Sequence, residues 1–167
     1  AMLVKEAVGT DTIARRDRAL RARAIAAWRD EPRIELLGAD ATAEALPILS
    51  FRVRDGGGRR VHHQLVTTML SALHGVQARG GCACAGPYAH RLLGIDAEAS
   101  ETLRARLRKG DELAKPGWVR LNLSYLHDEE EIATILEAVR DVARRIETLE
   151  PLFAADAATA RFAPRAA

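Results

Sequence analysis

The chain of 167 residues is long enough for one domain that buries about two-thirds of the surface exposed by its unfolded form. Hydrophobic residues make up 48% and charged residues 29%, the balance of an ordinary globular protein, and at 4% aromatic the core must rely on Leu, Ile, Val and Ala. A net charge of +2 without a long basic block argues against a nucleic-acid partner, and no apolar run approaches the roughly 20 residues of a membrane-spanning helix.

The first half of the chain predicts one long helix followed by strands. A loose apolar face from Thr10 or Asp11 to about Arg29 indicates the helix, which must end before Pro32 because proline cannot continue it. Strands are predicted at 33–37 and 48–54.

A second helix is predicted over 61–74, with Gly75 as its stop. Its predicted buried stripe consists of Leu65, Met69, Leu70 and Leu73. His62 and His63 should point apart on this helix, at the surface or in its N-terminal turn, and so should not face one metal ion together. A short strand is predicted at 76–79.

Two further helices are predicted at 86–93 and 97–109, then a strand at 118–125. Alternation along this strand puts Val119, Leu121 and Leu123 on one face, and therefore Arg120 and Asn122 on the other. A last long helix is predicted to begin after Asp128, a suitable N-cap, with three glutamates at its positive end.

Strands mixed with helices without strict alternation predict an α+β fold, in which helices pack on a small, mostly antiparallel or mixed sheet. We expect residues 1–32 to form an N-terminal linking helix, residues 33–150 the α+β domain, and residues 151–167 a weakly specified tail.

The segment 79–87, Arg-Gly-Gly-Cys-Ala-Cys-Ala-Gly-Pro, holds both cysteines of the chain and precedes a predicted helix. One interpretation is a glycine-rich turn between a strand and a helix. The other is a site, because backbone amides at glycines and at helix starts attract anions. Cys82 and Cys84 could also share a metal with His90 or form a disulfide, but a structural zinc ion needs four ligands and the sequence has no second cluster.

This segment resembles the cysteine loop of class V aminotransferase-fold enzymes, which depend on pyridoxal phosphate and include the cysteine desulfurases. A second similarity is the run 117–125, Gly-Trp-Val-Arg-Leu-Asn-Leu-Ser-Tyr, with the acidic residues 129–131 after it. The likeness extends from about Ile34 to about Ala143 and corresponds to the C-terminal small domain of such enzymes.

The resemblance implies roles for several residues. Arg120 would hold the α-carboxylate of a small amino-acid substrate, with Arg79 assisting, and Asn122 and His90 are weaker candidates for the same site. Cys84 aligns with the cysteine that takes sulfur from substrate in one group of desulfurases, whose loop reads Arg-Thr-Gly-His-His-Cys-Ala-Gln-Pro; this chain lacks both of those histidines.

The resemblance also implies that the large domain, with its Schiff-base lysine for pyridoxal 5'-phosphate, is missing, so this chain alone would be an incomplete enzyme. A homodimer is expected, and desulfuration, transamination, epimerisation and lyase chemistry all stay open. Two other classes also stay open, a free-standing interaction module and a small thiol redox or metal protein. The start of the chain has no signal-peptide pattern and its two cysteines form no disulfide framework, so we expect a cytoplasmic protein.

Overall fold

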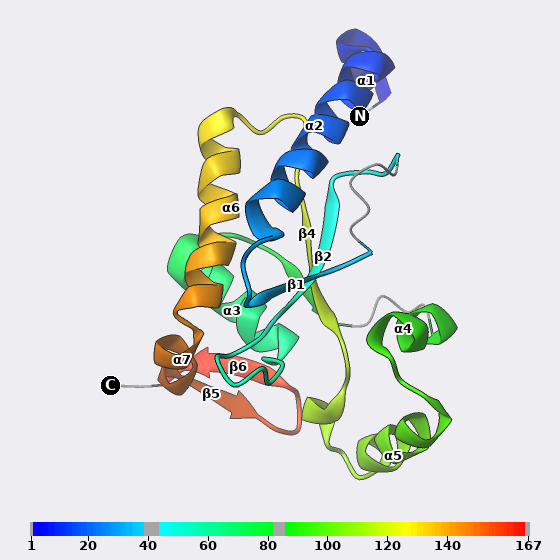
Figure 1. Cartoon of the computed structure of the whole chain (residues 1–167), viewed down its shortest axis with the longest axis vertical. Coiled ribbons are helices and arrows are strands. Elements are labelled where there is room, and N and C mark those ends of the chain that lie inside the picture. Colours follow the sequence, from blue (N-terminus) through cyan, green and yellow to red (C-terminus); the bar gives the residue numbers. More distant parts are fainter. Residues whose placement is uncertain (1, 39–43, 82–85, 166–167) are drawn as a thin grey trace.

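The computed structural model describes residues 2–38, 44–81 and 86–165 (Figure 1). The elements are α1 (Met2–Val8), α2 (Thr10–Trp28), β1 (Ile34–Leu37), β2 (Ile48–Val53), α3 (His63–His74), β3 (Arg79–Gly81), α4 (Gly86–Leu93), α5 (Ala97–Arg108), β4 (Trp118–Asn122), α6 (Glu129–Arg144), α7 (Ile146–Leu149), β5 (Phe153–Asp156) and β6 (Arg161–Pro164). Two 3₁₀ turns, Glu112–Ala114 and Glu150–Leu152, complete them.

Four strands form one antiparallel sheet in the order β1-β2-β4-β3. Strand β4 is therefore central, between β2 and β3, although α3, α4 and α5 separate it from β2 along the chain. This arrangement confirms the predicted α+β fold with a small antiparallel sheet.

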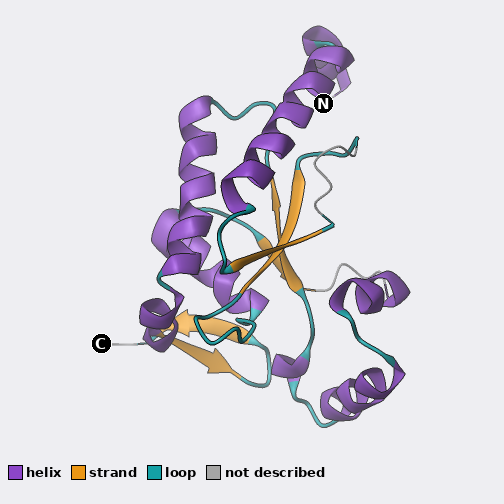
Figure 2. Cartoon of the chain, viewed as in Figure 1, coloured by secondary structure: helices purple, strands orange, loops and turns teal. Residues whose placement is uncertain are grey.

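The main core lies on one face of the sheet, which we call the inner face. Helices α2, α3 and α6 cover it (Figures 1 and 2). Trp28 of α2 is fully buried, stacks at a tilt on Phe51 of β2, and donates a hydrogen bond from Nε1 to the carbonyl of Leu136 in α6 at 3.1 Å. These contacts join two helices and the sheet at one point.

Three elements differ in detail from the sequence prediction. Helix α3 begins at His63, because the ring of His62 caps it by accepting a hydrogen bond from the Gln64 amide. Leu73 is 44% exposed rather than buried. In the last turn of α3 the residue that contacts α6 is His74, whose ring forms a hydrogen bond with the Asp141 carboxylate. Strand β3 begins at Arg79, three residues after the predicted start at Val76.

Strand β4 is shorter than predicted, because the chain turns after Leu123. The Leu126 amide donates to the Ser124 hydroxyl, and the Ser124 amide donates to Nδ1 of His127. Residues beyond Pro151, for which the sequence indicates little regular structure, form the hairpin β5–β6. Phe153 joins the core and Phe162 packs against it, which explains why the hairpin forms.

Helices α4 and α5 lie to one side of the remaining elements (Figure 2). Helix α4 packs through Ala89 and Leu93 on Trp118, and these three residues form a second, small core. Helix α5 buries none of its residues.

Candidate functional site

The outer face of the sheet, opposite the inner face, carries the polar side chains. Along β4, Val119 and Leu121 are buried in the main core, as predicted, so Trp118, Arg120 and Asn122 alternate onto the outer face. Helix α4 covers Trp118, and Arg120 beyond it is only half-buried.

Arg79 and Arg120 lie directly opposite each other on β3 and β4, as Cα partners in the antiparallel register. Residues paired in this way project to the same face with Cβ atoms about 4.5–5.5 Å apart. On the other side of Arg120, its partner is Ser50 of β2. The guanidinium of neither arginine has a hydrogen bond or an ion pair with any residue that the structure describes. Two guanidinium groups therefore share one rung of the sheet without a described carboxylate to balance them.

Asn122 ends β4 and is exposed, opposite Ile48 of β2. It lines a mainly apolar cleft of about 730 Å³ between α2 and the end of the sheet, together with Tyr125. Arg79 and Arg120 do not line this cleft. Asn122 thus shares the outer face with Arg120, but it borders a cleft that Arg120 does not line.

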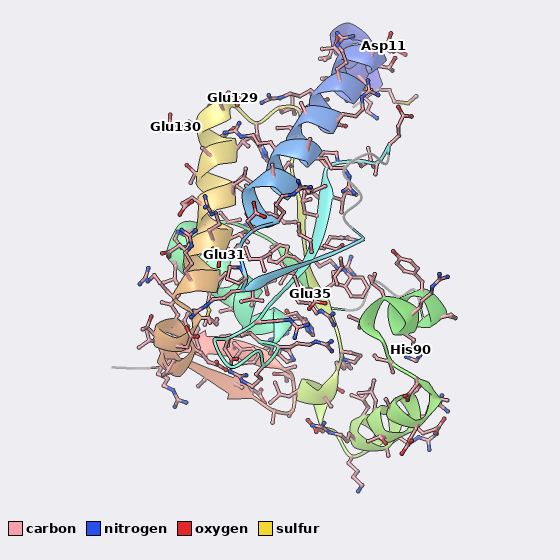
Figure 3. All side chains as sticks on the ribbon, in the orientation of Figure 1. Asp11, Glu31, Glu35, His90, Glu129 and Glu130 are labelled. Atoms are coloured by element: carbon pink, nitrogen blue, oxygen red, sulfur yellow. The ribbon has the colours of Figure 1, made fainter. Side chains whose placement is uncertain are left out.

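His90 projects from α4 and is half-buried (Figure 3). Within the described ranges its ring has no hydrogen bond or ion pair, so no contact ties it to the two arginines. The predicted thiols, Cys82 and Cys84, lie outside the described residues, between the end of β3 and the start of α4.

The two adjacent histidines do not point apart, contrary to the sequence prediction. Because His62 lies before α3 rather than inside it, its ring stacks on that of His63 with centroids 4.4 Å apart. His63 is buried rather than near the surface. Among residues with a described placement, no group of three or more histidines, cysteines or acids could hold a metal ion.

Burial of His63 and, to a lesser degree, the neighbouring His62 lower the pKa of His63 to about 4. Its ring touches the backbone that leads into the cysteine segment. A Cβ added at Gly80 would lie 3.1 Å from Cδ2 of His63, and one added at Gly117 would lie 2.8 Å from Cε1. The side-chain amide of Gln64 also donates to the Gly80 carbonyl at 3.3 Å. Glycine at these positions lets β3 pack directly on the start of α3.

Sequence reasoning missed a partly buried ion-pair group on the outer face. Glu35 of β1 accepts from Arg52 of β2, its Cα partner, and from Arg54 at 2.6 Å. Burial would raise the pKa of Glu35, but the hydrogen bonds and charges of the two arginines outweigh it and lower that pKa. The alternation in the predicted strands 33–37 and 48–54 was the available signal, because it puts Glu35 and Arg52 on the face opposite Phe51.

The lysines do not fit a pyridoxal phosphate site within this chain. Lys5 is exposed on α1, Lys109 is exposed at the end of α5, and Lys115 is exposed and paired with Glu112. The cavities that Lys5 and Lys115 line include neither Arg79 nor Arg120. A Schiff base beside the two arginines would need a lysine from another polypeptide or domain.

Comparison with known proteins finds little sequence similarity. No protein family matches the sequence, and no characterised protein matches it either. Among solved structures, the chain is similar to the cysteine desulfurase CsdA from Escherichia coli, in its S-sulfonic acid form, at 21% identity and a TM-score of 0.49. The alignment covers 81% of this chain and 26% of that one, so the chain spans about a quarter of the length of that enzyme.

None of the helices in the described part of the chain is both long and apolar enough to cross a membrane.

Proposed function

We propose that this chain is the C-terminal small domain of a class V aminotransferase-like, pyridoxal-phosphate-dependent enzyme, in which Arg120, assisted by Arg79, binds the carboxylate of a small amino-acid substrate. The observation that carries the proposal is the pairing of Arg79 with Arg120 across β3 and β4 without an acidic partner among the described residues.

A structural role accounts poorly for this pair. Two like charges directly opposite each other on neighbouring strands destabilise a sheet. Arginines kept for stability are expected to meet a carboxylate, as Arg52 and Arg54 do at Glu35. A guanidinium group presents two parallel N–H donors that match both oxygens of a carboxylate. A bound substrate carboxylate would therefore supply the negative charge that these two arginines do not receive from any described residue.

The remaining parts of the site would come from a large domain that holds the cofactor, since the lysines of this chain do not fit it. Residues 1–32 would connect the two domains. Apolar side chains are exposed at that end of the molecule, on α1 and at and just before the start of β2, as a second domain would require: Met2, Leu3, Val4, Val8, Leu46 and Ile48. Cys84 would place a thiol near the substrate, Asn122 and His90 would border it, and the enzyme would act as a cytoplasmic homodimer.

Carboxylate binding by the isolated chain tests the arginine assignment. Arginine side-chain N–H signals would be followed by NMR during titration with acetate and with alanine, at constant ionic strength. We expect weak, saturable binding, roughly millimolar, that Arg120→Gln weakens at least about tenfold. Arg108→Gln, at the exposed end of α5, is the matched control and should leave binding unchanged. Equal binding by Arg120→Gln and the unaltered chain would refute the assignment.

A second candidate function is a free-standing interaction module, and the exposed apolar side chains at the α1 end favour it. Such a module needs no carboxylate site. Substitution of Leu3 and Leu46 by serine would then abolish partner binding, while Arg120→Gln would have no effect on it.

A further inference from the structure

A second cleft, of about 230 Å³, lies beside the end of β2, apart from the Arg79–Arg120 pair. Segment 60–63, the residues before β4 and the end of α4 surround it. Three cationic side chains line it, those of Arg52, Arg60 and Lys115. Neither Arg79 nor Arg120 does so, which makes this cleft separate from the proposed carboxylate site.

Arg52 is only 6% exposed, yet part of its hydrogen-bonding capacity is unused. One of its nitrogens, Nη2, donates to Glu35. The other two, Nε and Nη1, have no acceptor in the described part of the chain. Leaving such buried donors without a partner costs roughly 1–3 kcal/mol each. Arg52 therefore lines the cleft and holds two buried donors that have no acceptor among the described residues.

The charges around the cleft are unbalanced. Three cations line it, and a fourth, Arg54, shares Glu35 with Arg52. Among the described residues, two carboxylates pair with these four groups: Glu35, and Glu112 on Lys115. Arg60 has no ion pair with any described residue. An excess of two positive charges is left around a small volume.

The environment of Arg60 reflects this imbalance. Burial lowers the pKa of Arg60, and the positive charge of Arg52 lowers it further, although Glu35 acts in the opposite sense. The two imidazoles at the cleft, His62 and His63, add no charge at neutral pH, because burial lowers the pKa of each. Nδ1 of His62 accepts from the Gln64 amide, so the neutral ring carries its proton on Nε2. An interaction with the Leu113 backbone partly opposes the effect of burial on the pKa of this ring.

We propose that this cleft binds a small, doubly charged oxyanion of the phosphate class, either free phosphate or the phosphate group of a small monoester. Its charge matches the excess of two positive charges, and its oxygens are acceptors for guanidinium donors. The volume is below the range of about 300–1,000 Å³ that is typical of pockets for larger organic ligands, which argues against a nucleotide.

Calorimetric titration of the chain with inorganic phosphate tests the proposal, with sodium chloride at matched ionic strength as the control for screening. Glycerol phosphate is titrated in a second arm to distinguish a free ion from a monoester. Saturable binding of either is expected, and ring signals of His62 and His63, but not of His90, should shift in NMR spectra. Heat equal to that of chloride, or shifts confined to other residues, would overturn the proposal.

Variants locate the binding. Arg60→Gln changes an exposed side chain and should weaken phosphate binding at least about tenfold, the effect of losing a charge-assisted hydrogen bond. Arg52→Lys, which keeps the charge near Glu35 but loses the planar donors, should also weaken it. Arg108→Gln and Arg120→Gln should leave it unchanged, so this proposal and the carboxylate site can fail separately. Unaltered affinity in Arg60→Gln would contradict the cleft as the site.

Discussion

The imidazole of His63 is buried where α3, β3 and the residues before β4 meet, and its pKa is about 4 in the folded chain. An unfolded histidine has a pKa of about 6.5. The unfolded state therefore binds a proton more readily than the folded state between these two values. His63 contributes its full stabilisation above pH 6.5, and this contribution is lost as the pH falls toward 4.

We expect the free energy of unfolding to fall by up to about 3 kcal/mol between pH 7 and pH 4 on account of His63 alone. His63→Gln should remove most of that pH dependence, and His90→Gln, at a half-buried position, should keep it. Urea unfolding of all three proteins at several pH values measures the difference. Identical pH profiles for His63→Gln and the unaltered chain would show that His63 does not titrate as described.

Arg120 gives a second prediction at the residue scale, because its position suits ligand binding better than stability. Removing one of two opposed like charges relieves repulsion across the strands. Arg120→Gln should therefore leave the free energy of unfolding unchanged or raise it, by about 0.2–1 kcal/mol, while it weakens carboxylate binding. Arg108→Gln should change neither. A loss of stability above about 1 kcal/mol in Arg120→Gln would instead indicate a structural role.

At the scale of elements, α6 is the helix whose start the sequence specifies best. The Asp128 side chain accepts from the Glu131 amide at 2.8 Å, and the Glu131 side chain accepts from the Asp128 amide at 2.9 Å. Glu129 lies in the same turn, at the start of α6 (Figure 3). It pairs with both Arg16 and Arg23 of α2, so the start of α6 is also fixed to its neighbour.

Asp128→Ala should lower the free energy of unfolding by about 1 kcal/mol, because it leaves the Glu131 amide without an acceptor. Glu130→Ala removes a charge from the same turn and should cost less, since only its interaction with the helix dipole is lost. Thermal unfolding measured by circular dichroism compares the two variants. Equal losses would mean that the cap contributes nothing beyond its charge.

Local patterns predicted most elements, but not the contacts between distant segments. Alternation correctly placed Val119 and Leu121 in the core, and Gly75 ends α3 in the left-handed conformation expected of a C-terminal glycine. Leu73 was assigned to the core wrongly, because helical spacing cannot tell where a partner helix stops covering the last turn. The hairpin β5–β6 depends on Phe153 reaching a core built by earlier elements.

For the site, alternation along the predicted strand could place Arg120 on the outer face. Spacing in the sequence could not place Arg120 beside Arg79. That pairing depends on β3 adding to the far side of β4, after α4 and α5 have intervened. The cleft at Arg52 and Arg60 likewise combines residues from four separate segments. Strand order sets both sites, and short-range periodicity carries no information about strand order.

At the scale of the whole molecule, the proposed function makes this chain one part of a larger catalytic unit. The chain builds its own core and presents two arginines on the outer face of its sheet, while its three lysines lie elsewhere. An enzyme of the proposed class needs a lysine-bearing domain opposite that face.

The most direct test is to isolate, from the source cells, the polypeptide that an antibody against this chain recognises, and to measure its mass and its bound pyridoxal phosphate. The proposed function predicts a polypeptide much heavier than 18.2 kDa, or a stable complex with a second chain, that carries the cofactor and its visible absorption. A polypeptide of 18.2 kDa that carries no cofactor and has no partner chain would contradict it.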